Sequence, residues 1–333
     1  MNSLLGKYRP TIILALALTV FLASCKGTST TLDPTDPPGT TDPPGPGTKS
    51  WVVTTFASGF NEPSGVAVDS SDNLYVVDRK NNSIQKITPE GVVSPFASGF
   101  RQPRDLAVDS DGNVYVADTY NNRIRKITPA GAKSIFAGGG IPGQADGTGR
   151  NATFDGPFGV AVVGTGDSLL IYVADHNNHT IRRITSTRVV TTIAGTADSL
   201  GTEDGDRATA RLHSPNTIAV DLSGNLYVVE DSNRIRKVTP TGDIATIAGD
   251  GTTAKFHYPF GVAVVGSGDN LLIYVADTHN NRIQKITSEG VVSTFPDTTA
   301  QFNSPRGMAV NSDGTILYVA DAGNNRIRKI EYK

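Results

Sequence analysis

The sequence predicts an all-β fold, a six-bladed β-propeller of four-stranded antiparallel blades. The first observation is a repeat: a proline, an apolar strand, a segment like Tyr-Val-Ala-Asp and a turn like Asn-Asn-Arg-Ile recur six times. The second is its spacing, because repeats of 40 to 57 residues rich in β-branched and aromatic residues suit four strands each. One tyrosine marks each copy, at Tyr75, Tyr115, Tyr172, Tyr227, Tyr274 and Tyr318.

The second copy shows how each repeat divides into strands. Apolar segments at 106–109 and 114–117 precede a basic segment at 123–128 and a short strand at 133–136. The breaks between them carry Gly, Asn, Asp or Pro, which suit tight turns. The first two segments are almost continuously apolar, which indicates strands covered on both faces by neighbouring blades.

The two ends of the repeat region predict how the ring closes. The last copy stops after 326–331 and lacks a fourth strand. The segment Trp51–Phe56 resembles the fourth strand at 92–96, but no other strands of a repeat precede it. We therefore expect this N-terminal strand to pair with 326–331 and to complete the last blade, which removes the open sheet edges.

The start of the chain predicts export and a lipid anchor. A basic start precedes an apolar run at 11–23, which is shorter than the roughly 20 residues that a membrane span needs. The run ends in Leu-Ala-Ser-Cys, which resembles a bacterial lipobox, and Cys25 is the one cysteine of the chain. The resemblance implies a lipoprotein signal peptide over 1–25 with a lipid on Cys25; the alternative is a plain secretory signal.

Composition divides and limits the rest of the chain. Residues 26–50 are rich in Pro, Gly, Thr and Asp and predict a disordered tether, because they carry too little apolar surface to fold. Residues 51–333 form one propeller domain. The chain has 30 Lys and Arg against 32 Asp and Glu, a net charge of −2, which argues against a nucleic-acid partner.

The copies resemble the NHL repeat. The resemblance rests on Pro-x-Gly-Val-Ala-Val-Asp, Leu-Tyr-Val-Ala-Asp and Asn-Asn-Arg-Ile-Arg-Lys-Ile, and it covers residues 51–333, although the turn of the fourth copy is one residue shorter. An acid and an arginine five residues later, such as Asp118 and Arg123, recur around the ring. A catalytic pair is needed once, so we interpret the recurring pair as a hydrogen bond that stabilises the turn.

The residue after the opening proline differs from copy to copy and is our candidate ligand site. The loop that carries it shares one mouth of the central channel with the hairpins between the second and third strands. Two guanidinium groups suit a carboxylate or phosphate, and two aromatic rings suit apolar parts of a ligand. The alternative is a ring that only lines a water-filled channel. The six residues are Ser64, Arg104, Phe158, Asn216, Phe260 and Arg306.

The five histidines map to the same mouth, beside two long entry loops at 138–156 and 195–214 that are rich in Gly and acids. The simplest interpretation is a polar rim, because no metal-spacing motif is present. The sharper hypothesis is a divalent-cation site with His176, His213 and His257 as candidate ligands. We assign no catalytic residue, because the sequence has no nucleophile elbow, phosphate loop or dinucleotide motif.

We therefore expect a lipid-anchored binding scaffold in the bacterial cell envelope, at the outer membrane or cell surface or in the periplasm. Its expected partners are the membrane, through Cys25, and an envelope protein or a small anionic ligand, without nucleic acid or a required cofactor. The alternative is a divalent-cation-dependent lyase or lactonase-type hydrolase that uses the same mouth. In the peptidyl-amidating lyases, which the repeats resemble, zinc-binding histidines follow the corresponding proline, and none does here.

Overall fold

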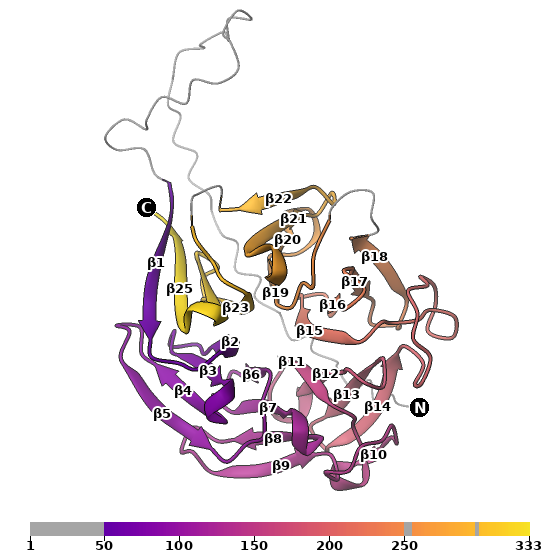
Figure 1. Ribbon diagram of the computed structural model, residues 1–333. Coiled ribbons are helices and arrows are strands. Elements are labelled where there is room, and N and C mark those ends of the chain that lie inside the picture. Colours follow the sequence, from indigo (N-terminus) through magenta and orange to yellow (C-terminus); the bar gives the residue numbers. More distant parts are fainter. Residues whose placement is uncertain (1–49, 250–254, 297–299) are drawn as a thin grey trace, which may run out of the picture. The chain divides into compact units, whose positions relative to one another are not determined.

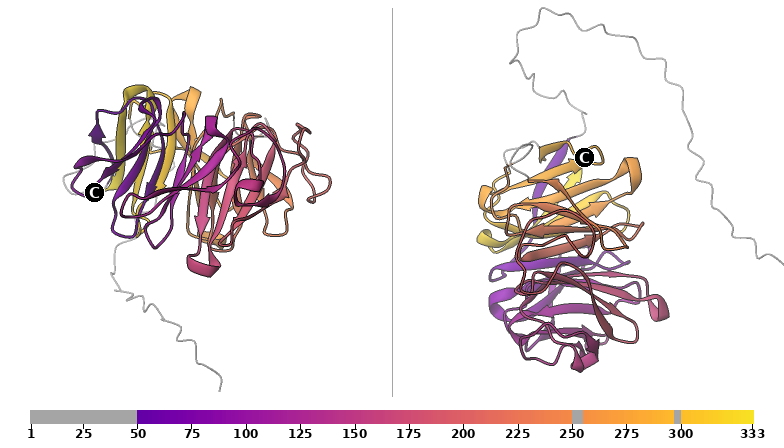
Figure 2. Two further views of the ribbon diagram at one scale, coloured as in Figure 1. Left: turned by 90° about the horizontal axis from the view of Figure 1, so that it is seen from below. Right: turned by 90° about the vertical axis from the view of Figure 1, so that its right-hand side faces the viewer.

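The computed structural model describes residues 50–249, 255–296 and 300–333; the predicted signal peptide, Cys25 and the tether up to residue 49 lie outside them. The described residues form six antiparallel sheets around a central axis, so the six-bladed propeller is confirmed (Figure 1). Figure 2 shows the ring from two further sides. Within the described part of the chain, we find no helix with the length and hydrophobicity of a membrane span.

Each sheet is one blade, numbered 1 to 6 in chain order. The first strand of each blade contacts the first strand of the next blade, so these strands surround the axis. Blade 1 contains β2 (Pro63–Val68), β3 (Leu74–Asp78), β4 (Ser83–Ile87) and β5 (Val93–Ser98), and blade 2 contains β6 (Leu106–Val108), β7 (Val114–Asp118), β8 (Arg123–Ile127) and β9 (Lys133–Ala137).

Blade 3 has a fifth strand that the sequence did not predict. This strand, β10 (Gly147–Thr148), lies in the first long loop and pairs with the outer strand β14 (Val189–Ala194). The other strands of blades 3 to 5 follow the predicted order. They are β11 (Pro157–Val163), β12 (Leu170–Asp175) and β13 (Thr180–Thr185); β15 (Pro215–Val220), β16 (Leu226–Glu230), β17 (Ile235–Val238) and β18 (Ile244–Ala248); β19 (Val262–Val265), β20 (Leu272–Asp277), β21 (Arg282–Thr287) and β22 (Val292–Phe295).

The N-terminal strand completes blade 6, as predicted. Strand β1 (Trp51–Ser58) runs antiparallel to β25 (Arg326–Tyr332), with Val53 opposite Ile330, and Figure 1 shows the indigo β1 beside the yellow β25. The blade continues inward with β24 (Ile316–Asp321) and β23 (Pro305–Val310). The two ends of the repeat region therefore form one sheet, without an open gap in the ring.

Short 3-10 helices shape the turns. Four of them, η1, η2, η6 and η7, connect the second and third strands of their blades, and each ends in an Asn with left-handed backbone, such as Asn122 at a φ of 48°. Asn tolerates this conformation better than most residues. The 3-10 helices are η1 (Arg79–Asn81), η2 (Thr119–Asn121), η3 (Gly149–Asn151), η4 (Gly166–Ser168), η5 (Gly268–Asn270), η6 (Thr278–Asn280) and η7 (Ala322–Asn324).

The apolar core consists of six clusters, one at each interface between neighbouring blades. Strand β7 shows the reason, because Val114 and Val116 pack toward blade 1 while Tyr115 and Ala117 pack toward blade 3. Side chains of a strand alternate between its two faces, so a central blade strand must be apolar on both. This packing explains the continuous apolar segments of the sequence.

Neighbouring blades approach each other closely near the axis. A Cβ added to Gly65, two residues after the opening proline of blade 1, would lie 2.6 Å from the Cα of Asp105 in blade 2. The equivalent Gly159 lies equally close to the next blade, since a Cβ added to it would lie 2.6 Å from the Cα of Thr217. The glycine of the Pro-x-Gly motif therefore makes room for the next blade.

Each left-handed Asn also links its blade to the next one. The side-chain Oδ1 of Asn122 accepts a hydrogen bond of 2.9 Å from the backbone N–H of Gly156, just before the opening proline of blade 3. At the closure of the ring, Asn325 Oδ1 accepts a 2.9 Å bond from the N–H of Glu62 in blade 1. The contact that links blades 2 and 3 therefore also links blades 6 and 1, where the ring closes.

Replacing Asn325 tests this link. Asn325→Ala should lower the free energy of unfolding by about 2 kcal/mol, about half from the lost hydrogen bond and half from the left-handed backbone. Asn325→Gly keeps the backbone relaxed, so it should cost only about 1 kcal/mol. Chemical denaturation measures both values, and equal stability of Asn325→Ala and the unmodified protein would contradict the prediction.

Candidate functional site

A buried acid at the end of the second strand of each blade positions both loops of the mouth. Asp118 accepts a 2.8 Å bond from the backbone N–H of Arg101 in the entry loop, and 3.0 and 3.2 Å bonds from Asn121 Nδ2 and Arg123 Nε in the turn. The Asp-to-Arg pair therefore stabilises the turn, as predicted. The six acids are Asp78, Asp118, Asp175, Glu230, Asp277 and Asp321, all buried.

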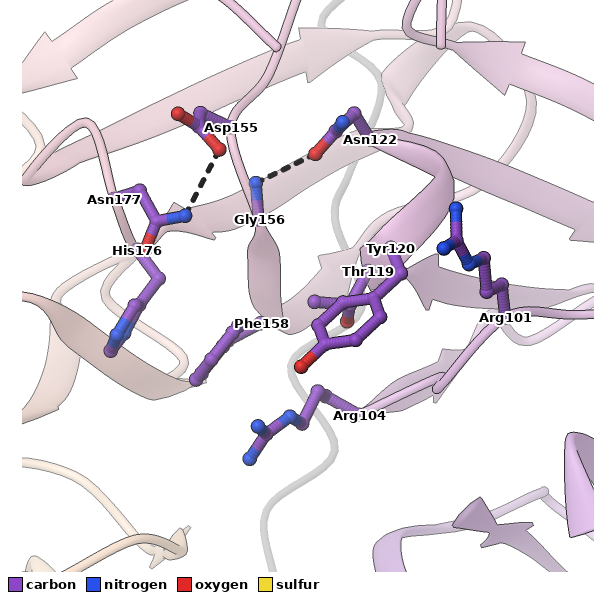
Figure 3. Close-up of a pocket in the computed structure, with 10 residues that line it drawn as sticks. All are labelled: Arg101, Arg104, Thr119, Tyr120, Asn122, Asp155, Gly156, Phe158, His176 and Asn177. Carbon is purple, nitrogen blue, oxygen red and sulfur yellow. Dashed lines mark hydrogen bonds between the residues drawn. The ribbon is translucent and has the colours of Figure 1, made fainter. Parts of the chain in front are cut away.

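Five of the six predicted mouth residues line one cavity of about 290 Å³. Ser64 does not, because it is fully buried and donates a 2.6 Å hydrogen bond to the carbonyl of Arg104. A second hollow of about 410 Å³ (Figure 3) shares Arg104, Phe158 and His176 with the first, so the two form one mouth. The five residues are Arg104, Phe158, Asn216, Phe260 and Arg306.

The charges of Arg104 and Arg306 are not matched by an ion pair within the described residues. Neither forms an ion pair with any residue that the structure describes, and Arg104 Nε and Arg306 Nη1 are buried without a hydrogen-bond acceptor there. Burial lowers the pKa of both groups; for Arg104 the charge of Arg306 acts in the same direction, while Tyr120 and the charge of Asp231 act in the opposite one. Two desolvated cations thus face one cavity.

Arg79 lies near Arg104 and Arg306 without lining either hollow, and the sequence did not predict it. Its guanidinium pairs with Glu62 and donates a 3.0 Å bond to Gln102. Burial, and then the charges of Arg306 and Arg104, lower the pKa of Arg79 to about 10. The three arginines come from blades 6, 1 and 2; because Glu62 pairs with Arg79, the uncompensated positive charge on this side is that of Arg104 and Arg306.

The residue after each buried acid forms a second ring around the mouth. In blades 2 and 5, Thr119 and Thr278 donate 2.8 and 2.7 Å hydrogen bonds to the carbonyl of the next opening proline. In blade 3, His176 Nδ1 lies 3.2 Å from that carbonyl, which can only accept, so Nδ1 carries the proton. Variation from copy to copy could have revealed this ring, which comprises Arg79, Thr119, His176, Asp231, Thr278 and Ala322.

The aromatic rings of the mouth stack on cations and on a histidine. The rings of Phe158 and His176 lie 3.8 Å apart and nearly parallel, and Arg104 Cζ lies 4.3 Å from the Phe158 centroid. Phe260 lies 5.6 Å from Arg306 Cζ and 5.9 Å from Arg104 Cζ. The rings therefore lie against the flat guanidinium groups. Their contact with apolar parts of a ligand stays a prediction.

Comparison with known proteins agrees with this architecture. A family model described as NHL repeat matches residues 60–87, 100–127 and 302–330. The chain contains NHL repeats. The matched NHL repeats lie in blades 1, 2 and 6, which are the blades that supply Arg79, Arg104 and Arg306.

Three proteins are examples of those that this chain resembles in sequence or in structure. NHL repeat-containing protein 2 of Bos taurus is 31% identical over 168 residues, which are 44% of this chain and only 23% of that protein. An auxiliary nutrient binding protein of Bacteroides thetaiotaomicron has a TM-score of 0.66 at 18% identity, over 86% of this chain and 77% of its own. Virginiamycin B lyase of Staphylococcus aureus has a TM-score of 0.58 at 17% identity, over 85% and 99%. The two structural likenesses show a shared fold.

The candidate metal ligands His176, His213 and His257 belong to blades 3 to 5. Among the described residues, no three His, Cys, Asp or Glu side chains gather as a metal site. The backbone N–H of His213 donates to Glu230, and that of His257 donates to Asp277. His179 replaces a left-handed Asn: its φ is 57°, and its Nδ1 accepts a 3.2 Å bond from the N–H of Ser214.

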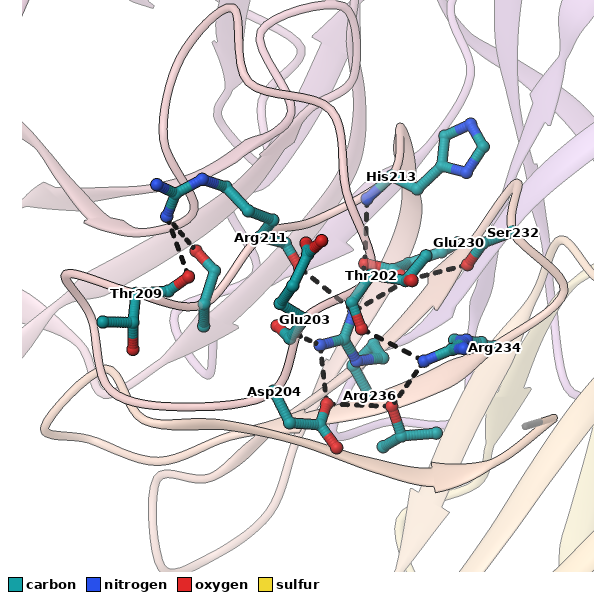
Figure 4. A network of polar contacts seen from close by, with 12 residues as sticks. Thr202, Glu203, Asp204, Thr209, Arg211, His213, Glu230, Ser232, Arg234 and Arg236 are labelled. Carbon is teal, nitrogen blue, oxygen red and sulfur yellow. Dashed lines mark hydrogen bonds and ion pairs between the residues drawn. The ribbon is translucent and has the colours of Figure 1, made fainter.

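A buried arginine holds each long loop of blades 3 and 4. Arg236 binds Glu230 of its own blade, Asp204 of the loop at 2.8 Å and two loop carbonyls (Figure 4). Arg182 binds Asp175, Asp146 and two loop carbonyls in the same way. Asp146 and Asp204 therefore hold their loops in place by binding these buried arginines. Both precede a glycine, a shared Asp-Gly pair that the sequence analysis overlooked.

Asp105 occupies the position that is Gly in four other blades. Its carboxylate is buried beside the axis, and Oδ2 accepts a 3.1 Å bond from the N–H of Val160 in blade 3. Burial raises the pKa of Asp105 to about 7, although hydrogen bonds from Val160 and Leu106 act in the opposite direction. The charged carboxylate is therefore poorly solvated at neutral pH.

The pH dependence of stability should show this shift. A raised folded-state pKa means that the charged carboxylate destabilises the fold above pH 7, and the penalty shrinks as the pH falls toward the unfolded value near 4. Against Asp105→Asn, which does not titrate, the unmodified protein should gain about 1 kcal/mol per pH unit as the pH falls from about 7 to about 5. Denaturant titrations of both proteins measure this; a difference that is constant with pH would refute the assignment.

Proposed function

We propose that this NHL propeller is a lipid-anchored, extracytoplasmic binding protein that takes a small anionic ligand into the mouth of its central channel. The observation that carries the proposal is the pair Arg104 and Arg306, which line one cavity without an ion-pair partner among the described residues. The fold itself is compatible with many activities, so the argument rests on this site.

The energetics favour an anion at this position. Two neighbouring guanidinium groups repel each other, and burial deprives both of the water that would screen them. A carboxylate or phosphate that binds between them gains charge-assisted hydrogen bonds and relieves the repulsion. Arg182 and Arg236 show the contrast, since each of these buried arginines has two acidic partners.

One structural neighbour is described as an auxiliary nutrient binding protein, which is a compatible role. At 18% identity that likeness shows the fold alone. The support for ligand binding therefore comes from the cavity, its unpaired cations and the rings that orient them.

The anion site predicts selective loss of binding. Purified protein equilibrated with a mixture of small carboxylates and phosphate esters should retain at least one anion, measured by mass spectrometry. Arg104→Gln combined with Arg306→Gln should reduce that retention by about tenfold or more, because a charge-assisted hydrogen bond contributes about 1.5–3 kcal/mol.

Arg188→Gln is the matched control, because Arg188 is exposed in the turn between β13 and β14 and does not line either hollow of the mouth. It should retain the anion as the unmodified protein does. Equal retention of every anion by the double variant would reject the site. A stoichiometric divalent metal in the same preparation would instead favour the lyase or lactonase alternative.

The lipid anchor rests on the sequence around Cys25. A lipid on this residue would hold the protein at a membrane, because an acyl chain contributes about 0.8 kcal/mol per buried CH₂ group. Cys25→Ser should therefore move the protein from the membrane fraction to the soluble fraction of the producing bacterium. Fractionation followed by immunoblotting measures the shift, and an unchanged membrane fraction would argue against the anchor.

A further inference from the structure

The mouth is electrically asymmetric. The arginines that line the cavity, Arg104 and Arg306, come from blades 2 and 6; Arg79 of blade 1, which pairs with Glu62, lies near them without lining it. One carboxylate lines the same cavity, that of Asp231 from blade 4, which stands opposite blade 1 in a ring of six. Cations thus occupy one side of the cavity and an acid the other.

The fold does not require an acid at this position. In blades 2 and 5 the equivalent Thr119 and Thr278 tie their blade to the next by donating to the carbonyl of its opening proline. A carboxylate cannot donate, so Asp231 cannot make this contact. Instead, Asn216 Nδ2 lies 3.4 Å from the carbonyl of Pro259 and supplies the link. Blade 4 therefore departs from the common pattern and replaces the lost contact with another side chain.

Asp231 is also held in a fixed orientation. Its Oδ1 accepts a 2.9 Å hydrogen bond from Asn216 Nδ2, and its backbone N–H donates to the carbonyl of His213. Its Oδ2 lies 3.7 Å from His176 Nε2, and its side chain is 35% exposed. Burial lowers the pKa of His176, although Asp231 and the hydrogen bond to Pro215 act in the opposite direction, so the imidazole is neutral at neutral pH and does not compensate the charge of the acid.

We propose that the ligand is a small zwitterion, whose carboxylate or phosphate binds between Arg104 and Arg306 and whose ammonium group binds Asp231. This inference rests on the proposed anion site and adds a second charged contact to it. A ligand with two anionic ends would place like charge against Asp231, so the same residue discriminates against dianions.

A matched set of six-carbon probes tests the inference. Caproate carries the anion alone, ε-aminocaproate adds an ammonium group at the far end, and adipate replaces it with a second carboxylate. The shorter γ-aminobutyrate and δ-aminovalerate, each beside its own unaminated acid, cover smaller charge separations. Isothermal titration calorimetry at low ionic strength should show the best amino acid binding about tenfold tighter than its unaminated analogue, and adipate weaker than both.

Two variants locate the effect. Asp231→Asn keeps the acceptor for Asn216 and should abolish the preference for the aminated probe, while binding of caproate stays equal or improves. Asp231→Thr places in blade 4 the residue type that blades 2 and 5 use, so it should fold normally and lose the same preference. Arg104→Gln should weaken caproate and its aminated analogue alike.

The possible failures are distinguishable. If the unmodified protein binds aminated and unaminated probes equally, or if both Asp231 variants keep the preference, the zwitterion is overturned and the anion site stands. If no amino acid of the series binds although other anions are retained, the zwitterion is likewise overturned. If Arg104→Gln changes no affinity, the anion site fails as well.

Discussion

The geometry of the mouth depends on one buried carboxylate in each blade. One oxygen of Asp118 holds the entry loop through a backbone N–H, while its other oxygen holds the turn through Asn121 and Arg123. The residues after the proline and after the acid are thereby placed side by side, whatever their side chains are. The scaffold is thus fixed by positions that repeat, and the chemistry of the mouth by positions that vary.

This separation also explains what could be predicted from sequence. Repeats reveal strands, turns and closure, because each copy confirms the others. The pairing of Trp51–Phe56 with the last strand was predicted from a missing strand at one end and a surplus strand at the other, and the structure confirms it. The six residues after the proline could be named for the same reason, and five of them share a cavity.

The remaining features depend on contacts that no single copy contains. Phe158 stacks on Arg104 of the preceding blade, and Arg79 lies near cations from blades 2 and 6. Within its own repeat, Arg182 resembles the other arginines of the third strands. Its partner Asp146 lies in a long loop that the repeat pattern does not contain. Such pairings arise from the ring as a whole, so they become visible only when the blades are placed next to each other.

The pairing of β1 with β25 has a consequence for biosynthesis. Of the described strands, β1 is made first and β25 last, so β1 stays without its partner while the six blades are translated. A waiting strand with free N–H and C=O groups is a hazard for aggregation. Contacts between segments so distant in the chain also form slowly. The ring can therefore close only after all six blades have been made.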